Sequence, residues 1–492
     1  MDTSPAPSIR IRLGMYPAAA QPALYGWISR ASRLRVEPRA RSPRETGPAR
    51  PRRPVRRDVV SVRVAVVGAG AAGISAAHRL RSDADVTVFE ASDRPGGHAR
   101  TVEVTDDGRT LGLDTAFVVY NEPHYPEITR FFDHLGVATR EHPGRFSFFD
   151  LDSPTAYVSE DFDLTAEQVR ERYPDEFVRL WEEATRFYRE SPRDFIRKRT
   201  DCPLGEYLDR NGYSEEFKYG FVVLVSTAAW SVPAERIWDM PASTVVAFFL
   251  AHGAEGLGGR AVPWRTVTGG SVHYVRAAVE ELRRCGNEVR VNAPVTRVRE
   301  QEDGVAVRTD EGVEHFDYAV LATHADDALA VLDRPTERQR MLEAVRYHRT
   351  RVDLHTDPAV MPADRGRWRS WNYGRLRGGG TQDSWVVYYL NELQGLTSEH
   401  DYFVTLDCPV PIDESRLIER FDYRHPIFTI DVRRMQPDIH SVNEGSRVKF
   451  AGSYFHSRRM GPDIVGSHES AFDSGSAAAE SVRRDAADRA VA

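Results

Sequence analysis

Residues 62–90, VRVAVVGAGAAGISAAHRLRSDADVTVFE, decide the fold. The first six form a short apolar run rich in β-branched residues, which is typical of a buried parallel strand. Glycines at positions 68, 70 and 73 follow at once, then a helical stretch to Leu80, then a second strand that ends in Glu90. This order of strand, GxGxxG turn, helix, strand and acid predicts a dinucleotide-binding unit.

The residue types of this unit suit the phosphates and sugar of a dinucleotide. Gly68 allows the tight turn, Gly70 lets the backbone approach a pyrophosphate, and Gly73 lets the helix pack closely on the strand. Glu90 lies 22 residues after Gly68, where its carboxylate can accept hydrogen bonds from a ribose. The small residues of the same turn are assigned to the site with them: Ala69, Ala71 and Ala72.

A second glycine loop, Arg94-Pro-Gly-Gly-His98, follows the acid and suits a close approach to the same ligand. From this loop onward the chain resembles the flavin-containing amine oxidase and phytoene desaturase superfamily, in which an acid followed by R-x-G-G marks FAD rather than NAD. Most of that superfamily has Arg after the paired glycines, where this chain has His98. The run GGHART, residues 96–101, is similar to a bacterial branch usually called "predicted NAD/FAD-binding protein". Segments 113–121, 264–271 and 370–373 look like further signatures of that branch.

The resemblance covers roughly residues 62–485 and implies an α/β fold. Its parts would be a Rossmann-type FAD-binding domain of the glutathione-reductase-like kind and a mixed α+β substrate domain. It also implies that a helix opening at Gly466 and Ser467 stabilises negative charge on the flavin, and that Val295 touches the adenine through its backbone. The remaining residues assigned to the cofactor are Ala91, Gly96, Gly97, Ala99, Ala322, Gly452 and Ser453.

The expected FAD domain is discontinuous, at residues 60–125, 262–345 and 445–485. Residues 126–261, mostly helical in pattern, and residues 346–444, which alternate like antiparallel strands, form the expected substrate and cap domain. Residues 1–58 are rich in Arg and Pro and lack an apolar period, so we expect a disordered extension. A basic arm, a targeting peptide and untranslated sequence are alternative interpretations of this stretch.

The whole chain of 492 residues has a net charge of −7, with 63 Arg but three Lys, a skew that suggests a bacterial gene. Its three cysteines lie far apart, in no metal-binding or disulfide spacing, which favours free thiols in the cytoplasm. No run is long and apolar enough to span a bilayer, although contact with a membrane surface stays open. We expect no metal and no nucleic-acid partner.

The chemistry at the flavin is less constrained by the sequence. Amine oxidases of the resembled superfamily commonly place a Lys near flavin N5, and the matching region, residues 345–350, has none. The apolar segment 217–253 suggests a cap over an apolar substrate, free or carrier-bound. Residues expected near the flavin ring, and so candidates for catalysis, are Tyr120, Trp230, His324, Tyr373 and Tyr454.

These observations favour an FAD-dependent oxidoreductase that desaturates or isomerises an unsaturated acyl, polyene or isoprenoid-like chain. An amine or amino-acid oxidase that yields imine and hydrogen peroxide is the first alternative. A flavin-binding assembly protein without turnover is the second. No Cys or His stands in a flavinylation context, so the FAD is expected to be non-covalent.

Overall fold

The computed structural model describes residues 62–153, 156–252, 263–376 and 384–491. The predicted disordered extension lies outside these residues. Residues 61–457 and 462–492 form one compact unit, and the elements below belong to it. Among the helices that the structure describes, none has the length and apolarity needed to cross a membrane.

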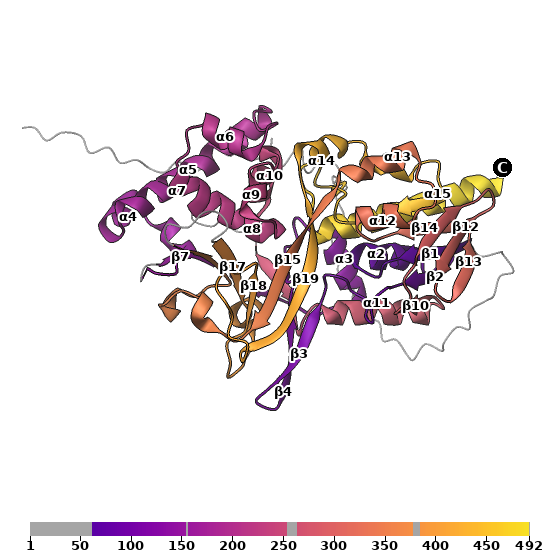
Figure 1. The fold of residues 1–492 in the computed structure, drawn as a ribbon, viewed down its shortest axis with the longest axis horizontal. Helices are drawn as coiled ribbons and strands as arrows, with labels where there is room; N and C mark the ends of the chain where they lie inside the picture. Colours follow the sequence, from indigo (N-terminus) through magenta and orange to yellow (C-terminus); the bar gives the residue numbers. More distant parts are fainter. Residues whose placement is uncertain (1–61, 154–155, 253–262, 377–383, 492) are drawn as a thin grey trace, which may run out of the picture. The chain divides into compact units, whose positions relative to one another are not determined.

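A five-stranded sheet, with strand order β10-β2-β1-β14-β20, is the frame of the nucleotide-binding part (Figure 1). All of its neighbouring strands run parallel. The strands come from distant parts of the chain: β1 (Val62–Val67), β2 (Ala84–Phe89), β10 (Glu288–Arg290), β14 (Tyr318–Leu321) and β20 (Val448–Phe450). The predicted first and second strands are therefore confirmed.

Alternate residues of β1 pack on opposite layers, because successive side chains of a strand point to opposite faces. Val64 and Val66 pack with helices α2 (Ala71–Leu80) and α15 (His468–Val491). Ala65 and Val67 face the other layer. That layer is an antiparallel sheet of β11 (Arg297–Glu300), β12 (Val305–Thr309) and β13 (Gly312–Phe316).

Two glycines make the close packing of α2 feasible. A Cβ on Gly73 would lie 1.9 Å from the carbonyl oxygen of Gly68, and a Cβ on Gly475 would lie 2.1 Å from that of Ala72. The predicted role of Gly73 is therefore confirmed. Helices α3 (Pro126–Leu135) and α11 (Val272–Arg284) complete this layer beside α15.

The substrate part is built on a seven-stranded sheet of order β19-β15-β18-β17-β16-β7-β8. Its strands are antiparallel except that β16 runs parallel to β7. They are β7 (Phe146–Asp150), β8 (Ala156–Val158), β15 (Arg346–His355), β16 (Trp371–Arg375), β17 (Ser384–Tyr389), β18 (Phe403–Leu406) and β19 (Leu417–Ile427). The antiparallel sheet expected in residues 346–444 is confirmed, while β7 and β8 join it from a region predicted to be helical.

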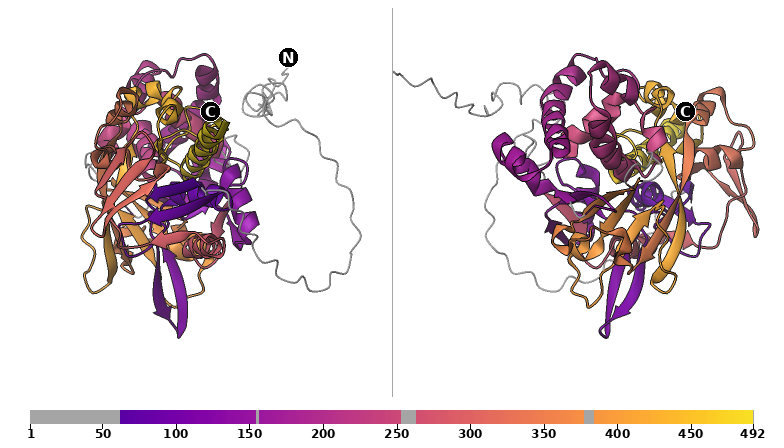
Figure 2. Two further views of the ribbon diagram at one scale, coloured as in Figure 1. Left: turned by 90° about the vertical axis from the view of Figure 1, so that its right-hand side faces the viewer. Right: turned by 60° about the vertical axis from the view of Figure 1, so that its left-hand side comes forward.

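Helices cover one face of this sheet (Figure 2, right). They are α4 (Ala166–Arg172), α5 (Asp175–Ile196), α6 (Leu204–Arg210), α7 (Glu215–Phe217), α8 (Val223–Trp230), α9 (Ala234–Ile237) and α10 (Ala242–His252), with a π-helical turn, Lys218–Val222, joining α7 to α8. A large apolar cluster joins their inner faces to β7, β16 and β17. The described part of the apolar segment 217–253 thus forms helices of this layer, and Val225, Ala229 and Trp230 within it line the cavity described below.

Smaller elements join the two parts. The hairpin β3 (Thr101–Asp106) and β4 (Arg109–Asp114) projects from the body in Figure 1. A three-stranded sheet pairs β5 (Val119–Tyr120) and β6 (Thr139–His142) with β9 (Trp264–Val267). Three further short helices are α12 (Ala325–Val331), α13 (Glu337–Arg340) and α14 (Ile430–Met435).

The division into FAD and substrate domains stays a prediction, because both lie within one compact unit. One boundary falls inside a packed layer: α3 was assigned to the substrate domain, yet it contacts α11 and α15 of the nucleotide-binding part.

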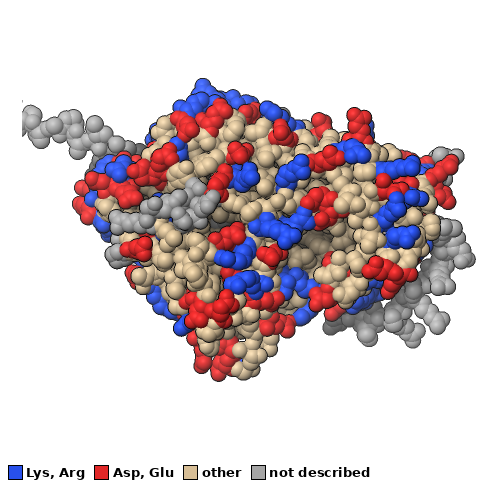
Figure 3. Space-filling view, in the orientation of Figure 1, with Lys and Arg blue, Asp and Glu red and all other residues tan. Residues whose placement is uncertain are grey.

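Cys202, Cys285 and Cys408 are free thiols. On the face seen in Figure 3, basic and acidic side chains are interspersed. Among the described ion pairs, Arg424 contacts both Asp326 and Asp327.

Candidate active site

A cavity of about 1010 Å³ joins the parallel sheet to the substrate part. It begins where Val67, Phe89 and Ala322 mark the carboxyl ends of β1, β2 and β14. Ligands of open parallel sheets bind at this edge, because the loops there are free to diverge around them. The cavity ends among the aromatic side chains of the substrate part, so its two ends differ in chemistry.

The nucleotide end of the cavity is held by two loops that bond to each other. The Gly96 N–H donates to the Ala69 carbonyl at 2.8 Å, which joins the two glycine motifs. The carboxylate of Glu90 accepts from the Ala69 N–H at 2.8 Å and from the Ser92 N–H at 2.9 Å. It also accepts from the Ser92 hydroxyl at 2.8 Å. The carboxylate therefore lines the cavity in a fixed orientation and keeps one acceptor position for a ligand.

The loop at Gly70 leaves a cradle beside the start of α2. An added Cβ on Gly70 would meet nothing within 4 Å, although Gly70 lines the cavity. The first N–H groups of α2 begin here, at the positive end of the helix dipole. The geometry fits a pyrophosphate, as the spacing of the glycines predicts.

The second helix that meets the cavity is α15. Ser467, just before it, accepts a hydrogen bond from the Ser470 N–H at 3.0 Å and so caps its N-terminus. Gly466 has φ of +77°, and a Cβ there would lie 2.6 Å from the ring of Phe428. Both residues line the cavity, so the start of α15 directs its dipole into it.

Two buried polar atoms between these ends have no hydrogen-bond partner among the described residues. They are Nε2 of His98 and the hydroxyl of Tyr454. Both residues line the cavity. Burial lowers the pKa of His98 to about 4, so its imidazole is neutral. Because unpaired buried polar atoms are costly, a polar group bound here would stabilise both. The residues present thus fit FAD.

Most residues assigned from the sequence come together on this cavity. The predicted cofactor residues on its wall are Gly68, Gly70, Ala71, Ala72, Glu90, Ala91, Gly96, Gly97, His98, Val295, Ala322, Gly452, Ser453, Gly466 and Ser467. Trp230, His324, Tyr373 and Tyr454 also line it. Their contributions to binding or catalysis stay predictions.

Five residues that the sequence assigned to the site do not line the described cavity. Ala69 and Ala99 are buried in the core, and Gly73 is packed against Gly68. Arg94 donates to the Gly97 carbonyl at 3.2 Å and so supports the second loop. Tyr120, expected near the flavin ring, instead packs against Phe132 with ring centroids 5.3 Å apart, so its position does not support a catalytic role.

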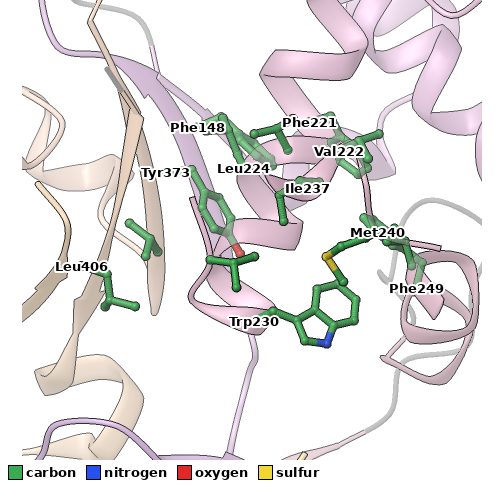
Figure 4. Packing of buried hydrophobic residues seen from close by; sticks show 14 of the residues in the cluster. Phe148, Phe221, Val222, Leu224, Trp230, Ile237, Met240, Phe249, Tyr373 and Leu406 are labelled. Carbon is green, nitrogen blue, oxygen red and sulfur yellow. The ribbon is translucent and has the colours of Figure 1, made fainter. Parts of the chain in front are cut away.

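The aromatic end is formed by residues from several helices and strands. The helical cap contributes Trp230, Phe248 and Phe249 to the cavity wall, and the sheet contributes Tyr373 and Tyr388. Figure 4 shows Trp230, Tyr373 and Leu406 with the apolar residues behind them. Burial raises the pKa of Tyr373 far above its usual value, so its hydroxyl stays protonated.

Polar residues occupy one part of the substrate wall. Arg145, Glu160 and Asp163 line the cavity there. Arg145 donates to Glu392 at 2.8 Å and lies 3.4 Å from Glu160, and its charge is thereby balanced.

Sequence reasoning missed two histidines on the cavity wall, His425 and His468. His468 is stacked on Phe117 at 3.7 Å between ring centroids, and its Nε2 lies 2.8 Å from the Tyr274 hydroxyl. His425 shares a face of β19 with Phe421 and Tyr423, because alternate residues of a strand point the same way. That alternation could have indicated from the sequence that His425 shares a face with Phe421 and Tyr423. No sequence pattern indicated that His468 stacks on Phe117.

The fold and this cavity define a flavoprotein with a dinucleotide-binding domain and a large substrate part. Residues 71–353 match the model of the flavin-containing amine oxidoreductase family, and the chain belongs to this family. It is accordingly an FAD-dependent oxidoreductase. No curated protein matches the chain.

Solved structures share the fold at low sequence identity. A protein from Exiguobacterium sp. 255-15, named provisionally as a protoporphyrinogen oxidase, is 16% identical with a TM-score of 0.61, over 86% of this chain and 99% of that chain. A putrescine oxidase is 18% identical with a TM-score of 0.60, over 88% and 99%. A fatty acid isomerase from P. acnes is 15% identical with a TM-score of 0.58, over 86% and 98%. These likenesses show the fold alone.

Proposed function

We propose that this FAD-dependent oxidoreductase acts on an apolar, unsaturated acyl, polyene or isoprenoid-like chain, which it desaturates or isomerises. The observation that carries the proposal is the aromatic end of the cavity, where Trp230, Phe249 and Tyr373 meet. No lysine stands on the described cavity wall. Such a wall gains free energy by burying apolar surface and has little to offer a small charged substrate.

The chain's own residues would divide the work between the two ends. Bound FAD supplies a two-electron acceptor for a hydride. Glu90 and the helix start at Gly70 hold the adenosine and pyrophosphate, and the start of α15 favours negative charge on the ring system. The aromatic end orients the apolar chain and excludes water. None of the three cysteines is on the described cavity wall, which supports non-covalent FAD.

Redox-neutral isomerisation is part of the same proposal. An apolar site without a lysine suits double-bond migration as well as net desaturation. One structural neighbour is a fatty acid isomerase.

An amine oxidase is the second candidate, and a different observation favours it. Glu160 and Asp163 line the cavity, and a carboxylate attracts an ammonium group. The family is that of flavin-containing amine oxidoreductases, and one neighbour is a putrescine oxidase. Against it, Glu160 also accepts a hydrogen bond from Arg369 at 3.0 Å, which offsets its charge.

The visible absorption of the holoenzyme under anaerobic conditions tests both candidates. We expect linoleic acid or a related polyene to bleach the flavin bands, and putrescine to leave them unchanged. Bleaching by putrescine alone would replace the proposal with the amine oxidase. If nothing bleaches the oxidised enzyme, the pre-reduced enzyme is incubated with linoleic acid, and the absence of any double-bond shift overturns the proposal.

A further inference from the structure

His425 presents an imidazole to the middle of the cavity. It lies on β19, and its ring centroid is 5.3 Å from that of His98, which also lines the cavity. Tyr423, two residues earlier on the same face, lines the cavity too. His98 belongs to the second glycine loop, while the Thr350 hydroxyl, 3.2 Å from His425 Nδ1, bonds to Ser231 beside Trp230. His425 therefore lies near both ends of the cavity.

The hydrogen bonds around His425 fix which ring nitrogen carries the proton. The Thr350 hydroxyl donates to the Ser231 carbonyl at 2.8 Å, which uses its single hydrogen. Nδ1 of His425 lies 3.2 Å from the same hydroxyl oxygen, which can then only accept. Nδ1 must carry the hydrogen, so Nε2 of the neutral ring keeps a free lone pair.

The surroundings keep this imidazole neutral. Burial lowers the pKa of His425 well below its usual value, and the nearby imidazoles of His98, His324 and His348 lower it further, because a second positive charge beside the first would be repelled. The adjacent charges are already paired: Arg424 lies 2.9 Å from Asp327, and Asp327 lies 3.5 Å from His324. Thr350 is only 1% exposed, so water does not replace it as the partner of Nδ1.

We propose that His425 is the catalytic proton acceptor of the reaction, with Nε2 as the accepting atom and Thr350 as the positioning residue. The inference rests on the proposed function and deepens it. In desaturation, one C–H bond of the substrate would break and its hydrogen would leave with both electrons as a hydride, for which bound FAD would be the two-electron acceptor. The neighbouring C–H bond loses its proton to Nε2 of His425, and its electron pair becomes the new double bond.

Two further histidines lie near His425 on the cavity wall. The ring of His98 lies 5.3 Å from that of His425 and 6.0 Å from that of His324. His324 faces Asp327, whose side chain is 50% exposed.

The first test needs no substrate. The holoenzyme labelled with ¹⁵N-histidine is studied by two-bond ¹H–¹⁵N correlation spectroscopy, which distinguishes the Nδ1–H from the Nε2–H form. The His425 signals are those that His425→Asn removes, or His425→Gln if that variant does not fold. We expect the neutral Nδ1–H form, unchanged between about pH 6 and 8. An Nε2–H form, or titration inside that interval, overturns the proposal.

Thr350→Val tests the positioning role in the same experiment. Without the acceptor at Nδ1, we expect the His425 signals to become a mixture of both tautomers. If the wild-type pattern persists, Thr350 does not position the ring and that part of the proposal is wrong.

The second test uses the rate at which linoleic acid or putrescine, whichever is active, bleaches the flavin. We expect His425→Asn to slow bleaching about 10²–10⁴-fold and Thr350→Val about tenfold, with FAD affinity unchanged. The matched control is His355→Asn, because His355 is a buried histidine of the same sheet, on β15, that does not line the described cavity. An unchanged rate in His425→Asn overturns the proposal. If neither compound bleaches the wild-type flavin, the proposed function is in question while the spectroscopic test still decides on His425.

Discussion

The two ends of the cavity are built in opposite ways. At the nucleotide end, the ligand-facing groups are backbone atoms and one carboxylate from a stretch of about thirty residues, with Glu90 and Ala69 in direct contact at 2.8 Å. At the aromatic end, each wall residue comes from a different element: Trp230 from α8, Phe249 from α10, Tyr373 from β16. A local motif specifies the first end, and long-range packing specifies the second.

This difference explains what each end can tolerate. Backbone contacts depend on glycine positions and not on side-chain identity, so a cofactor site can keep its shape while the rest of the chain diverges. Side-chain walls change with each substitution, so related folds can accept different substrates. Effects of mutation should therefore separate: changes at one end alter FAD binding, and changes at the other alter substrate choice.

The largest expected effect is at the nucleotide end. Gly70→Val combined with Glu90→Ala fills the cradle beside α2 and removes the carboxylate for the ribose. We expect a folded protein that is purified without FAD, because the added side chain takes the space of the pyrophosphate. Absorption at the flavin bands and circular dichroism measure the two properties.

Gly205→Val is the control for that double variant. Its Cβ would meet the nearest atom, on Trp238, at an ordinary 3.5 Å, and Gly205 is not on the described cavity wall. If the double variant keeps its flavin with unchanged affinity, the cofactor site lies elsewhere.

Next in size is Trp230→Ala at the aromatic end. Trp230 is 7% exposed and its ring lies 4.8 Å from that of Phe248, so truncation should cost about 3 kcal/mol of unfolding free energy. The enlarged cavity should accept bulkier compounds in the bleaching assay while FAD affinity changes less than about twofold. Trp181→Ala, on α5, should lower stability without altering substrate choice. If Trp181→Ala changed substrate choice as much as Trp230→Ala does, substrate choice would not be set by the aromatic end, and the separation of the two ends would be contradicted.

The sequence predicts the nucleotide end of the cavity in much more detail than the aromatic end. The spacing of Gly68, Gly70 and Gly73 before Glu90 identified the nucleotide end, because each residue has a backbone role that holds in any protein with this unit. Trp230 lies in an apolar segment and Tyr373 in a segment that resembles a signature of the branch, but their meeting could not be derived without the tertiary fold. Tyr120 shows the limit: an aromatic residue near a motif in sequence can turn its ring into the core. His425 shows the converse, since only the register of β19 against β15 gives it Thr350 as a partner.

A pH-dependent contribution to stability is expected behind the nucleotide end. Burial raises the pKa of Glu469 from 4.5 to about 8, and its carboxyl oxygens accept from the Glu127 and Ile128 N–H groups at the start of α3. Between these pH values the unfolded chain loses this proton while the folded protein keeps it. The stability that Glu469 contributes is full below about pH 4.5 and is lost as pH rises towards 8, by at most about 1.4 kcal/mol per pH unit.

Glu469→Gln keeps an acceptor for α3 but cannot titrate. Urea unfolding of the apoprotein should therefore show a flatter decline of stability with rising pH in this variant than in the wild type. Glu103→Gln, at a glutamate on β3 that pairs with Arg276, should keep the wild-type slope. The same slope in all three proteins would show that the Glu469 carboxyl is already ionised in the folded state.

The smallest expected effect distinguishes two tyrosines whose hydroxyls share the same feature. The hydroxyls of Tyr454 and Tyr318 are both buried without a partner among the described residues, but only Tyr454 lines the cavity. Removing an unpaired buried hydroxyl should leave apoprotein stability unchanged or raise it by about 1 kcal/mol in either Tyr→Phe variant. If bound FAD supplies the missing partner, Tyr454→Phe alone should weaken FAD affinity, by about fivefold for one hydrogen bond of about 1 kcal/mol. Fluorescence titration of the apoproteins with FAD measures this difference. Equal affinities would mean that the Tyr454 hydroxyl meets the substrate or water, and that the boundary between the two ends runs on the nucleotide side of Tyr454.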